Sequence, residues 1–481
     1  MNSLFFVLLP ALAAIVNPFL RRPGSRLADV LTWLVLLVGL AAAGLGGPGP
    51  GQGDALSALM LATIYLISFL VAVFSAFYFG DEDPTVAGKR ASFFSLILVC
   101  TAGMAGVVTT QDFFTLYVFL EVVAVSSFAM IAFSGDRAGT EGAVKYLFLS
   151  AVASALILLG VAALLLTSGG VSFAHLMETA LDGTRRPGVL LSVSLLICGF
   201  MVKSGLIPFH GWVPDAYESA PAPVSALLAG IVTKVAGVYA LIRIAMTLHL
   251  PLLGGDYSGL SAALMFFGAV SIVVGAVAAM KQNDFKRILA FSSISQIGYI
   301  VLAVGLGSPL ALVGAVFHLF NHATFKVTLF LNGAAIERAT GTRDMSRLGG
   351  LGSRMPWTAG TSAVAFLSTA GLPPLSGFWS KLIIVVALWQ GGAYAYATLA
   401  VLASTLTLGY FLVLQRKVFF GQTVPLTEDV QEVEAGLLMP VVLAAALMIL
   451  IGLYFPSVLE PLIEPSGSLA ALTSAVSGGT L

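Results

Sequence analysis

Ionisable side chains interrupt long apolar stretches of this chain. Glu121 lies near the middle of the run FFTLYVFLEVVAVSSF, and Lys203 and Lys234 lie in two later runs. A charged group in a membrane is costly, so such groups usually pair with one another or carry ions and protons. An amine that leaves water also gives up its proton more readily. The three residues predict a proton relay; for Glu121, an ion pair that only holds helices together is the alternative.

A second polar group forms a regular pattern. His318, His322 and Lys326 recur every four residues in VFHLFNHATFKVTLF, so they share one face of a helix. Histidine titrates close to neutral pH and can pass protons between flanking lysines, of which Lys381 follows in a later run. Packing histidines and a metal or haem site are the alternatives. A metal site needs ligands on facing helices, and His210 alone does not establish one.

Two short segments predict breaks in helices beside buried lysines. GLIPFHGW at 205–212 follows Lys203, and GLPPLSGF at 371–378 precedes Lys381. The prolines that carry this prediction are Pro208, Pro214, Pro373 and Pro374. Proline removes a backbone donor, and non-helical backbone at membrane depth is tolerated only where protein or a water-filled cavity satisfies it. We therefore expect polar cavities at both places, with ordinary proline kinks as the alternative.

The composition points to lipid as the solvent. Of 481 residues, 58% are hydrophobic and only 10% are charged, against about 25% charged in ordinary soluble domains. Equal numbers of basic and acidic residues, 23 of each, exclude a basic surface for nucleic acid. Cys100 and Cys198 both lie in apolar runs, which excludes a disulfide framework and a cysteine-ligated cluster. We expect no cofactor and no metal.

Apolar runs of about 20 residues, the length that crosses a bilayer, predict an all-α polytopic membrane protein. Fourteen such runs lie near 2–20, 28–45, 56–79, 91–109, 112–133, 143–167, 189–211, 222–247, 259–280, 286–306, 311–332, 358–389, 394–418 and 436–457. The first is read as a span and not as a cleavable signal, because basic residues follow it instead of preceding it. The seventh and twelfth carry the predicted breaks.

The basic residues between these runs predict the orientation. Loops after odd-numbered runs hold Arg21, Arg22, Arg26, Lys89, Arg90, Arg137, Lys281, Lys286, Arg287, Arg338, Arg343, Arg347, Arg354, Arg416 and Lys417, whereas loops after even-numbered runs hold Arg185 and Arg186. Cytoplasmic loops collect Lys and Arg, so we expect a multi-pass protein of the inner (plasma) membrane with both termini on the non-cytoplasmic side. Lys145 and Arg243 join the four buried lysines within the runs; Arg243 lies near a run's end, where snorkelling accounts for it.

An internal repeat is visible at nearly constant offsets. GLIPFHGW aligns with GLPPLSGF at an offset of 166 residues, and GAVKYLF at 142–148 aligns with GAVFHLF at 314–320 at an offset of 172. Spans four to eight are therefore repeated as nine to thirteen, and an odd number of spans gives the two copies opposite topology. We predict N-terminal spans at 1–90, repeats at 91–250 and 259–418, and a C-terminal loop, span and tail at 419–481.

These motifs resemble a known family. FLEVVAVSSF, KSGLIPFHGWVPDAYESAPAPVSALLAG, TKVAGVYALIR, QNDFKRILAFSSISQIGY, HLFNHATFKVTLFLNGAAIE and GLPPLSGFWSK are similar to the proton-conducting antiporter-like subunits of respiratory complex I, of Mrp-type Na+/H+ antiporters and of energy-converting hydrogenases. The stretches APAPVSALLAG and ATGTRDMSRLGGL look more like the Mrp D and hydrogenase branch.

The resemblance implies roles for individual residues. Glu121 would pair with Lys203, Lys234 would lie on the central axis, and Lys381 would gate the far exit, with His318 and His322 between them. Supporting residues along the proton path would be Lys145, Lys326, His210, Asp215 and Glu337.

The leading hypothesis is a subunit that moves protons, alone or in exchange for Na+, in a multisubunit complex with other membrane subunits, including a homologous one. The driving force would be an ion gradient or a redox reaction in partner chains. A redox subunit that binds quinone or haem, a solitary carrier for an organic solute, and a passive scaffold are the alternatives.

Overall fold

The structure is a computed structural model, and it describes residues 3–20, 26–45, 55–80, 88–181, 186–248 and 258–463. Within these ranges the chain is built from helices, and its β-structure consists of two isolated bridges. Arg21, Arg22 and Arg185 of the predicted loops lie outside the described residues, as do 81–87, 249–257 and the tail 464–481 of the predicted units.

Thirteen helical segments in the described residues are long and apolar enough to cross a membrane. They are Ser3–Leu20, Leu27–Leu45, Ala55–Tyr78, Arg90–Thr109, Phe113–Ile131, Arg137–Ser168, Pro187–Ser204, Ala222–Leu248, Ser258–Met280, Phe285–Leu306, Pro309–Thr340, Tyr394–Val418 and Ala435–Phe455. The remaining predicted span, at 358–389, is present as two helices of 15 residues each, α17 (Pro356–Ala370) and α18 (Ser376–Gln390). The structure is therefore the polytopic helical protein that the apolar runs predict.

Helices of the first half are α1 (Ser3–Val16), α2 (Leu27–Leu45), α3 (Ala55–Tyr78), α4 (Arg90–Thr109), α5 (Phe113–Ile131), α6 (Arg137–Ser168), α7 (Phe173–Leu181), α8 (Arg186–Ser204), α9 (Trp212–Ser219), α10 (Ala222–Leu227), η2 (Leu228–Val232), η3 (Lys234–Val238) and α11 (Tyr239–Leu248). Those of the second half are α13 (Ser258–Met280), α14 (Phe285–Leu306), α15 (Pro309–Thr340), α16 (Leu351–Arg354), α17, α18, α19 (Tyr394–Val418) and α20 (Ala435–Ile463). Short 3-10 turns occur at Asn17–Leu20, Met345–Arg347 and Pro425–Thr427.

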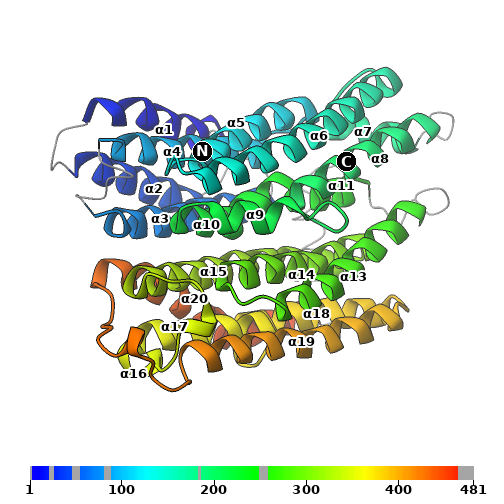
Figure 1. The fold of residues 1–481 in the computed structure, drawn as a ribbon. Coiled ribbons are helices and arrows are strands. Elements are labelled where there is room, and N and C mark those ends of the chain that lie inside the picture. Colours follow the sequence, from blue (N-terminus) through cyan, green and yellow to red (C-terminus); the bar gives the residue numbers. More distant parts are fainter. Residues whose placement is uncertain are drawn as a thin grey trace.

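The two halves form two parts of one bundle, and α15 lies along the boundary between them (Figure 1). This helix packs against α14, α17, α18 and α20 of its own half and against α3, α10 and η2 of the other. It carries His318, His322 and Lys326. The stripe predicted from the sequence therefore lies on the helix that joins the two halves.

Local features recur at the offsets of the predicted repeat. Asp112 caps α5 and bridges to Ser172, and 172 residues later Asp284 caps α14 and bridges to Asp344. Phe173 follows Ser172 of the first bridge, and its ring lies beneath the Arg243 guanidinium. Arg343 precedes Asp344 of the second bridge and donates to the Glu218 carbonyl. The five spans between the two caps place them at opposite ends of the bundle. This arrangement is what an inverted repeat requires.

Both predicted helix breaks are present. α8 ends at Ser204 and α17 ends at Ala370, and each is followed by a glycine with positive φ, Gly205 at 69° and Gly371 at 84°. Glycine is favoured there because it lacks a Cβ. The next residue in each break donates to a carbonyl five positions back, Leu206 to Met201 and Leu372 to Leu367. The chain resumes as α9 in the first half and α18 in the second.

The predicted eighth span differs from a regular α-helix. Two π-helical turns, η2 and η3, interrupt it between α10 and α11, and Lys234 is the first residue of η3. Turns with hydrogen bonds to the fifth residue are rare and are frequently found at functional sites. Apolar periodicity cannot distinguish them from an α-helix, so this distortion could not be predicted from the sequence.

A buried polar axis as the candidate functional site

An ion pair between α5 and α8 begins the site. Lys203 Nζ lies 3.5 Å from Glu121 Oε1 and donates to Ser150 Oγ at 3.1 Å. Its side chain is 3% exposed, whereas that of Glu121 is 37% exposed. Ser154 of α6 donates a hydrogen bond to the same carboxylate oxygen. The pairing implied by the resemblance is present, and one of its members faces the surface of this chain.

Lys234 lies deeper, in the distorted eighth span. Its side chain is fully buried, and its Nζ contacts the Ala229 carbonyl. No carboxylate of the described residues is within ion-pair distance of this amine. The adjacent Thr233 donates to the Leu228 carbonyl and shares a hydrogen bond with the Tyr217 hydroxyl of α9. The buried amine of Lys234 is therefore met by a backbone carbonyl of the distorted span and not by a carboxylate.

The two histidines of α15 are completely buried and stacked. Their ring planes are 3° apart and their ring centres are 6.4 Å apart. His318 Nδ1 is 2.9 Å from Ser380 Oγ of α18, and its Nε2 has no hydrogen-bond partner among the described residues. Neither ring nitrogen of His322 has one either. Buried polar atoms usually find partners, so three free ring nitrogens leave room for water or for transferred protons.

Lysines flank this pair on both sides. Lys326 is fully buried and donates to the Leu289 carbonyl at 3.0 Å and to Ser292 of α14. Lys381 of α18 donates to Ser404 Oγ of α19 at 3.2 Å, and its Nζ lies 4.6 Å from the centre of the Tyr299 ring. Such cation–π contacts stabilise a cation that has lost part of its hydration.

Ionisable groups of both halves lie within electrostatic range of His322. Lys234, Lys326, Lys381 and His318 all interact electrostatically with His322. Lys234 belongs to the first half and the other four residues to the second. The arrangement can therefore move a proton between the halves, each step changing the charge felt by the next group.

Lys145 does not lie in the buried axis. Its amine is 2.8 Å from both Glu141 and Asp215, and its side chain is 46% exposed. Arg287 joins this surface cluster through Asp215 at 3.4 Å and Glu218 at 2.6 Å. The apolar run around Lys145 did not reveal that the residue occupies an exposed helix face, and its supporting role in the proton path stays a prediction. Asp215 belongs to the same surface cluster.

Lys286 is the opposite case. It is counted with the loop residues at the start of the tenth apolar run, but it lies in α14 with a side chain only 4% exposed. Its Nζ is 3.6 Å from Glu337 Oε2 and donates to the Ala220 carbonyl at 3.0 Å. Arg343 lies 3.5 Å from the same carboxyl group. Lys286 therefore links Glu337 of α15 to the segment that joins α9 and α10.

The remaining predicted residues lie at the breaks. His210 is partly buried in the segment between α8 and α9, its ring 6.4 Å from that of Phe291. Pro208 and Pro374 follow cis peptide bonds, Pro373 precedes the second of these, and Pro214 lies in the first turn of α9. The backbone N–H of Ile207 donates to Ser271 of α13, so the second half satisfies part of the first break.

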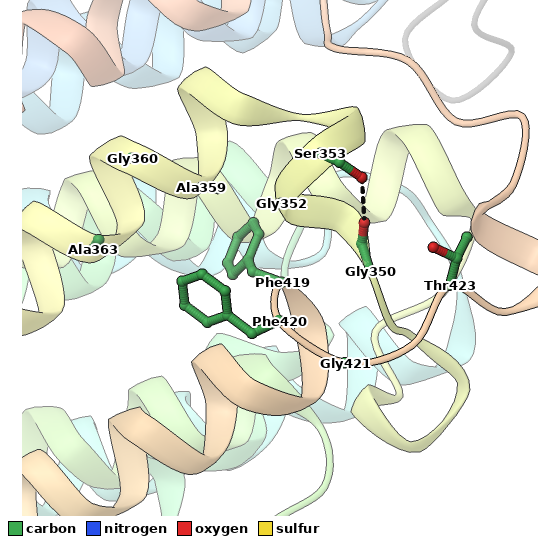
Figure 2. Close-up of a pocket in the computed structure, with 10 residues that line it drawn as sticks. All are labelled: Gly350, Gly352, Ser353, Ala359, Gly360, Ala363, Phe419, Phe420, Gly421 and Thr423. Atoms are coloured by element: carbon green, nitrogen blue, oxygen red, sulfur yellow. Dashed lines mark hydrogen bonds between the residues drawn. The ribbon is translucent and has the colours of Figure 1, made fainter.

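A surface cavity of about 490 Å³ lies away from this axis, where α16, α17 and the end of α19 meet (Figure 2). Its lining residues are Gly350, Gly352, Ser353, Ala359, Gly360, Ala363, Phe419, Phe420, Gly421 and Thr423. None of these ten side chains is ionisable. The cavity therefore cannot exchange protons through its own walls.

A family comparison agrees with the geometry. Residues 110–407 match the family described as NADH:quinone oxidoreductase/Mrp antiporter, TM. The chain belongs to this family. The matched region contains the whole buried axis, from Glu121 to Lys381, and both helix breaks.

Individual relatives agree with this membership. The chain is 33% identical to NADH-quinone oxidoreductase subunit N of Desulforudis audaxviator over 85% of its own length and 83% of that protein. It is 31% identical to the D-type Na(+)/H(+) antiporter protein of Alkalihalophilus pseudofirmus, over 83% and 80%. A chain in the structure of the Mrp complex from Dietzia matches with a TM-score of 0.86 and 26% identity, over 98% of both chains.

Several polar residues of the axis were not predicted from the sequence. They are Ser150, Ser154, Tyr299, Ser380 and Ser404, and each contacts one of the predicted ionisable groups. Serine and tyrosine are common in membrane helices, so their types carried no signal. Only a helix-face analysis relative to the lysines could have selected them.

Proposed function

We propose that the chain is a proton-translocating subunit of a multisubunit membrane complex and that protons move along the buried axis from Glu121 to Lys381. The observation that carries the proposal is the line of buried lysines and histidines that crosses from one half to the other through α15. Intramembrane ionisable groups are costly and usually serve ion or proton paths. Family membership supports the same function, since the relatives include antiporter and oxidoreductase subunits.

The Glu121–Lys203 pair acts as the first switch. While the carboxylate is 3.5 Å away, its charge stabilises the protonated amine. When the pair separates, Lys203 loses that support, and its proton can pass towards Lys234. Water between the two amines completes this step.

The second half receives the proton at the histidines. His322 lies within electrostatic range of Lys234 of the first half and of Lys326 and Lys381 of the second. Its free ring nitrogens can take up a proton on one side while releasing one on the other. Lys381, held against Tyr299 and Ser404, is the last group before release.

The driving force distinguishes two versions of this function. In a cation/proton antiporter the proton movement is exchanged against Na+, and in an oxidoreductase or hydrogenase it is driven by electron transfer in partner chains. The chains that co-purify with this subunit separate the two: only membrane subunits support an antiporter, and iron–sulfur polypeptides support a redox-driven pump. In either version a homologous antiporter-like subunit is an expected neighbour, and the inner membrane is the expected location.

The proposal is tested with Lys234→Ala in the assembled complex, reconstituted into vesicles with a pH-sensitive dye inside. We expect the variant to assemble normally and to lose proton translocation. Lys281→Ala is the matched control, because this lysine is exposed just beyond α13. A Lys234→Ala complex that translocates protons at the control rate would refute the relay.

A further inference from the structure

The second helix break lies directly against α20. This last helix packs against α15, α17 and α18 (Figure 1). Its Gly452 is buried, and a Cβ at this position would overlap the Pro374 carbonyl oxygen and lie 2.7 Å from the backbone nitrogen of Ser376. Because glycine has no side chain, the backbone of α20 can touch the backbone that joins α17 to α18.

Aromatic side chains complete this contact. Trp379 of α18 donates from Nε1 to the Gly452 carbonyl at 2.8 Å. Phe455, about one turn further along α20, stacks on Phe317 of α15 with ring centres 4.3 Å apart, and its ring centre is 6.1 Å from that of Trp379. The helix α20 is therefore held to both α18 and α15 beside the break.

The first turn of α18 carries residues of the buried axis. Ser380 follows Trp379, and its Oγ lies 2.9 Å from His318 Nδ1; Lys381 is the next residue. On the other side of the break, a Cβ at Gly371 would lie 2.9 Å from Lys381 Cδ, so the chain that leaves α17 packs on the stem of this lysine. A shift of the turn therefore moves both Ser380 and Lys381 relative to α15.

This turn is also packed tightly against α15 and α17. Asn321 of α15 donates to the Ser376 carbonyl at 3.0 Å, and the Gly377 N–H donates to Ser368 Oγ at 3.2 Å. A Cβ at Gly377 would overlap the Ser368 carbonyl oxygen. Closely packed interiors transmit strain instead of absorbing it. A displacement at Gly452 therefore reaches the turn.

The first break shares only part of this arrangement. Its Ile207 N–H donates to a serine of α13, so each break is contacted by the span that follows its own predicted repeat. At the offset of 166 residues, Gly211 corresponds to Gly377, but a Cβ at Gly211 would meet no atom within 4 Å. Trp379 corresponds to Val213, which has no side-chain donor. The glycine–tryptophan contact is therefore not a packing feature that the fold requires in both copies.

Few ionisable groups surround Lys381. The helix α17 contains none, and α20 contains only Tyr454 between residues 435 and 455. The charged residues of α19 lie in its last turn. The groups that face Lys381 or lie within its electrostatic range are Tyr299 of α14 and His318, His322 and Lys326 of α15. The position of the turn relative to α14 and α15 therefore sets the surroundings in which this amine exchanges a proton.

We propose that Gly452 is a positioning residue for Lys381: it presses on the second break, accepts from Trp379 and so fixes the first turn of α18. The placement of this turn is a claim about structure alone, whereas its effect on proton movement rests on the proposed function. A displacement of α20 thereby changes proton exchange at Lys381 without a change at any ionisable group.

Gly452→Ala tests the proposal in the assembled complex in vesicles. The added Cβ has to move outwards by about 1 Å to reach an ordinary contact distance of about 3.5 Å. The matched control is Gly436→Ala, about 24 Å earlier on the same helix at 1.5 Å per residue, where a Cβ would overlap the Phe77 ring of α3. If Gly452→Ala does not assemble, Trp379→Phe removes the donor to the Gly452 carbonyl and keeps an aromatic ring against Phe455.

Two properties are measured for each variant. Electron cryo-microscopy of the complex gives the position of the first turn of α18 relative to α15, and proton flux per assembled complex is recorded against pH. We expect Gly452→Ala to displace the turn by about 1 Å and to lower the flux by about ten- to a hundredfold, since a misplacement of about 1 Å can cost about a hundredfold. The pH of half-maximal flux should move by about one unit for a tenfold change in proton binding.

Trp379→Phe should change the same two properties by smaller amounts, and Gly436→Ala should leave both at their wild-type values. A turn that stays in place in Gly452→Ala, or a pH profile that coincides with that of Gly436→Ala, would overturn the positioning role, because a purely structural residue alters only the amount of assembled complex. If the wild-type complex moves no protons, the proposed function fails, and the displacement alone decides whether α20 holds the turn.

Discussion

Neutralising Glu121 should slow proton translocation while leaving the fold intact. Glu121→Gln keeps the shape of the side chain and can keep the hydrogen bond from Ser154, but it removes the charge that faces Lys203 at 3.5 Å. The perturbation is therefore electrostatic, and it acts on one pair.

The magnitude follows from Coulomb's law. Two unit charges 3.5 Å apart interact by about 5 kcal/mol at an effective dielectric constant of about 20. Glu121 is 37% exposed, so solvent screening reduces this to about 1–3 kcal/mol. At about 1.4 kcal/mol per factor of ten, the rate of a step that depends on this pair should fall roughly 10- to 100-fold.

The assay measures the initial rate of dye response in vesicles that contain the complex, with Glu178→Gln as the control. Glu178 is a carboxylate on α7, away from the buried axis, so its variant should keep the wild-type rate. Equal rates for Glu121→Gln and Glu178→Gln, with equal amounts of assembled complex, would show that the pair is only structural.

Two further predictions concern packing and pH. Gly237→Ala should lower the temperature midpoint of unfolding of the complex, because the added Cβ would lie 2.8 Å from the Phe200 carbonyl oxygen and close to Ser204. Overpacking of this kind costs about 1–3 kcal/mol of stability. Gly409→Ala, whose Cβ would meet no atom within 4 Å, is the control, and equal midpoints for the two variants would refute the close contact. Burial raises the pKa of the Asp284 carboxyl group in the folded protein, so ionisation of this group opposes folding. The free energy of unfolding should therefore decline as the pH rises from the ordinary aspartate pKa through the raised pKa of the folded state. Asp284→Asn keeps a capping side chain and should remove this slope in thermal unfolding measured against pH; an unchanged slope would contradict the assignment.

Much of the fold could be predicted from the sequence because membrane helices are recognisable by their length and hydrophobicity. The two helix breaks could also be predicted, because Gly205 and Gly371 and the prolines near them disfavour a continuous helix. The stripe on α15 was also predictable, because residues four apart share a helix face.

Other parts of the site depend on which way a helix faces, and this could not be predicted from the apolar pattern. Lys145 lies on the surface, whereas Lys286 is buried although it adjoins charged residues. Gly237 of the second π turn packs closely against Ser204 of α8, a contact that the apolar pattern does not reveal. The serines that contact the buried lysines and His318 come from several helices that only the tertiary structure brings together.

The most direct test of the central claim is proton flux through a complex that carries His322→Leu. Neither ring nitrogen of His322 has a hydrogen-bond partner among the described residues, so the substitution breaks none of the hydrogen bonds seen in the structure and should be compatible with assembly. It removes the titratable group that lies within electrostatic range of Lys234 of the first half and of Lys326 and Lys381 of the second. The account predicts an assembled complex without proton translocation. Flux at the wild-type rate in that complex would contradict it.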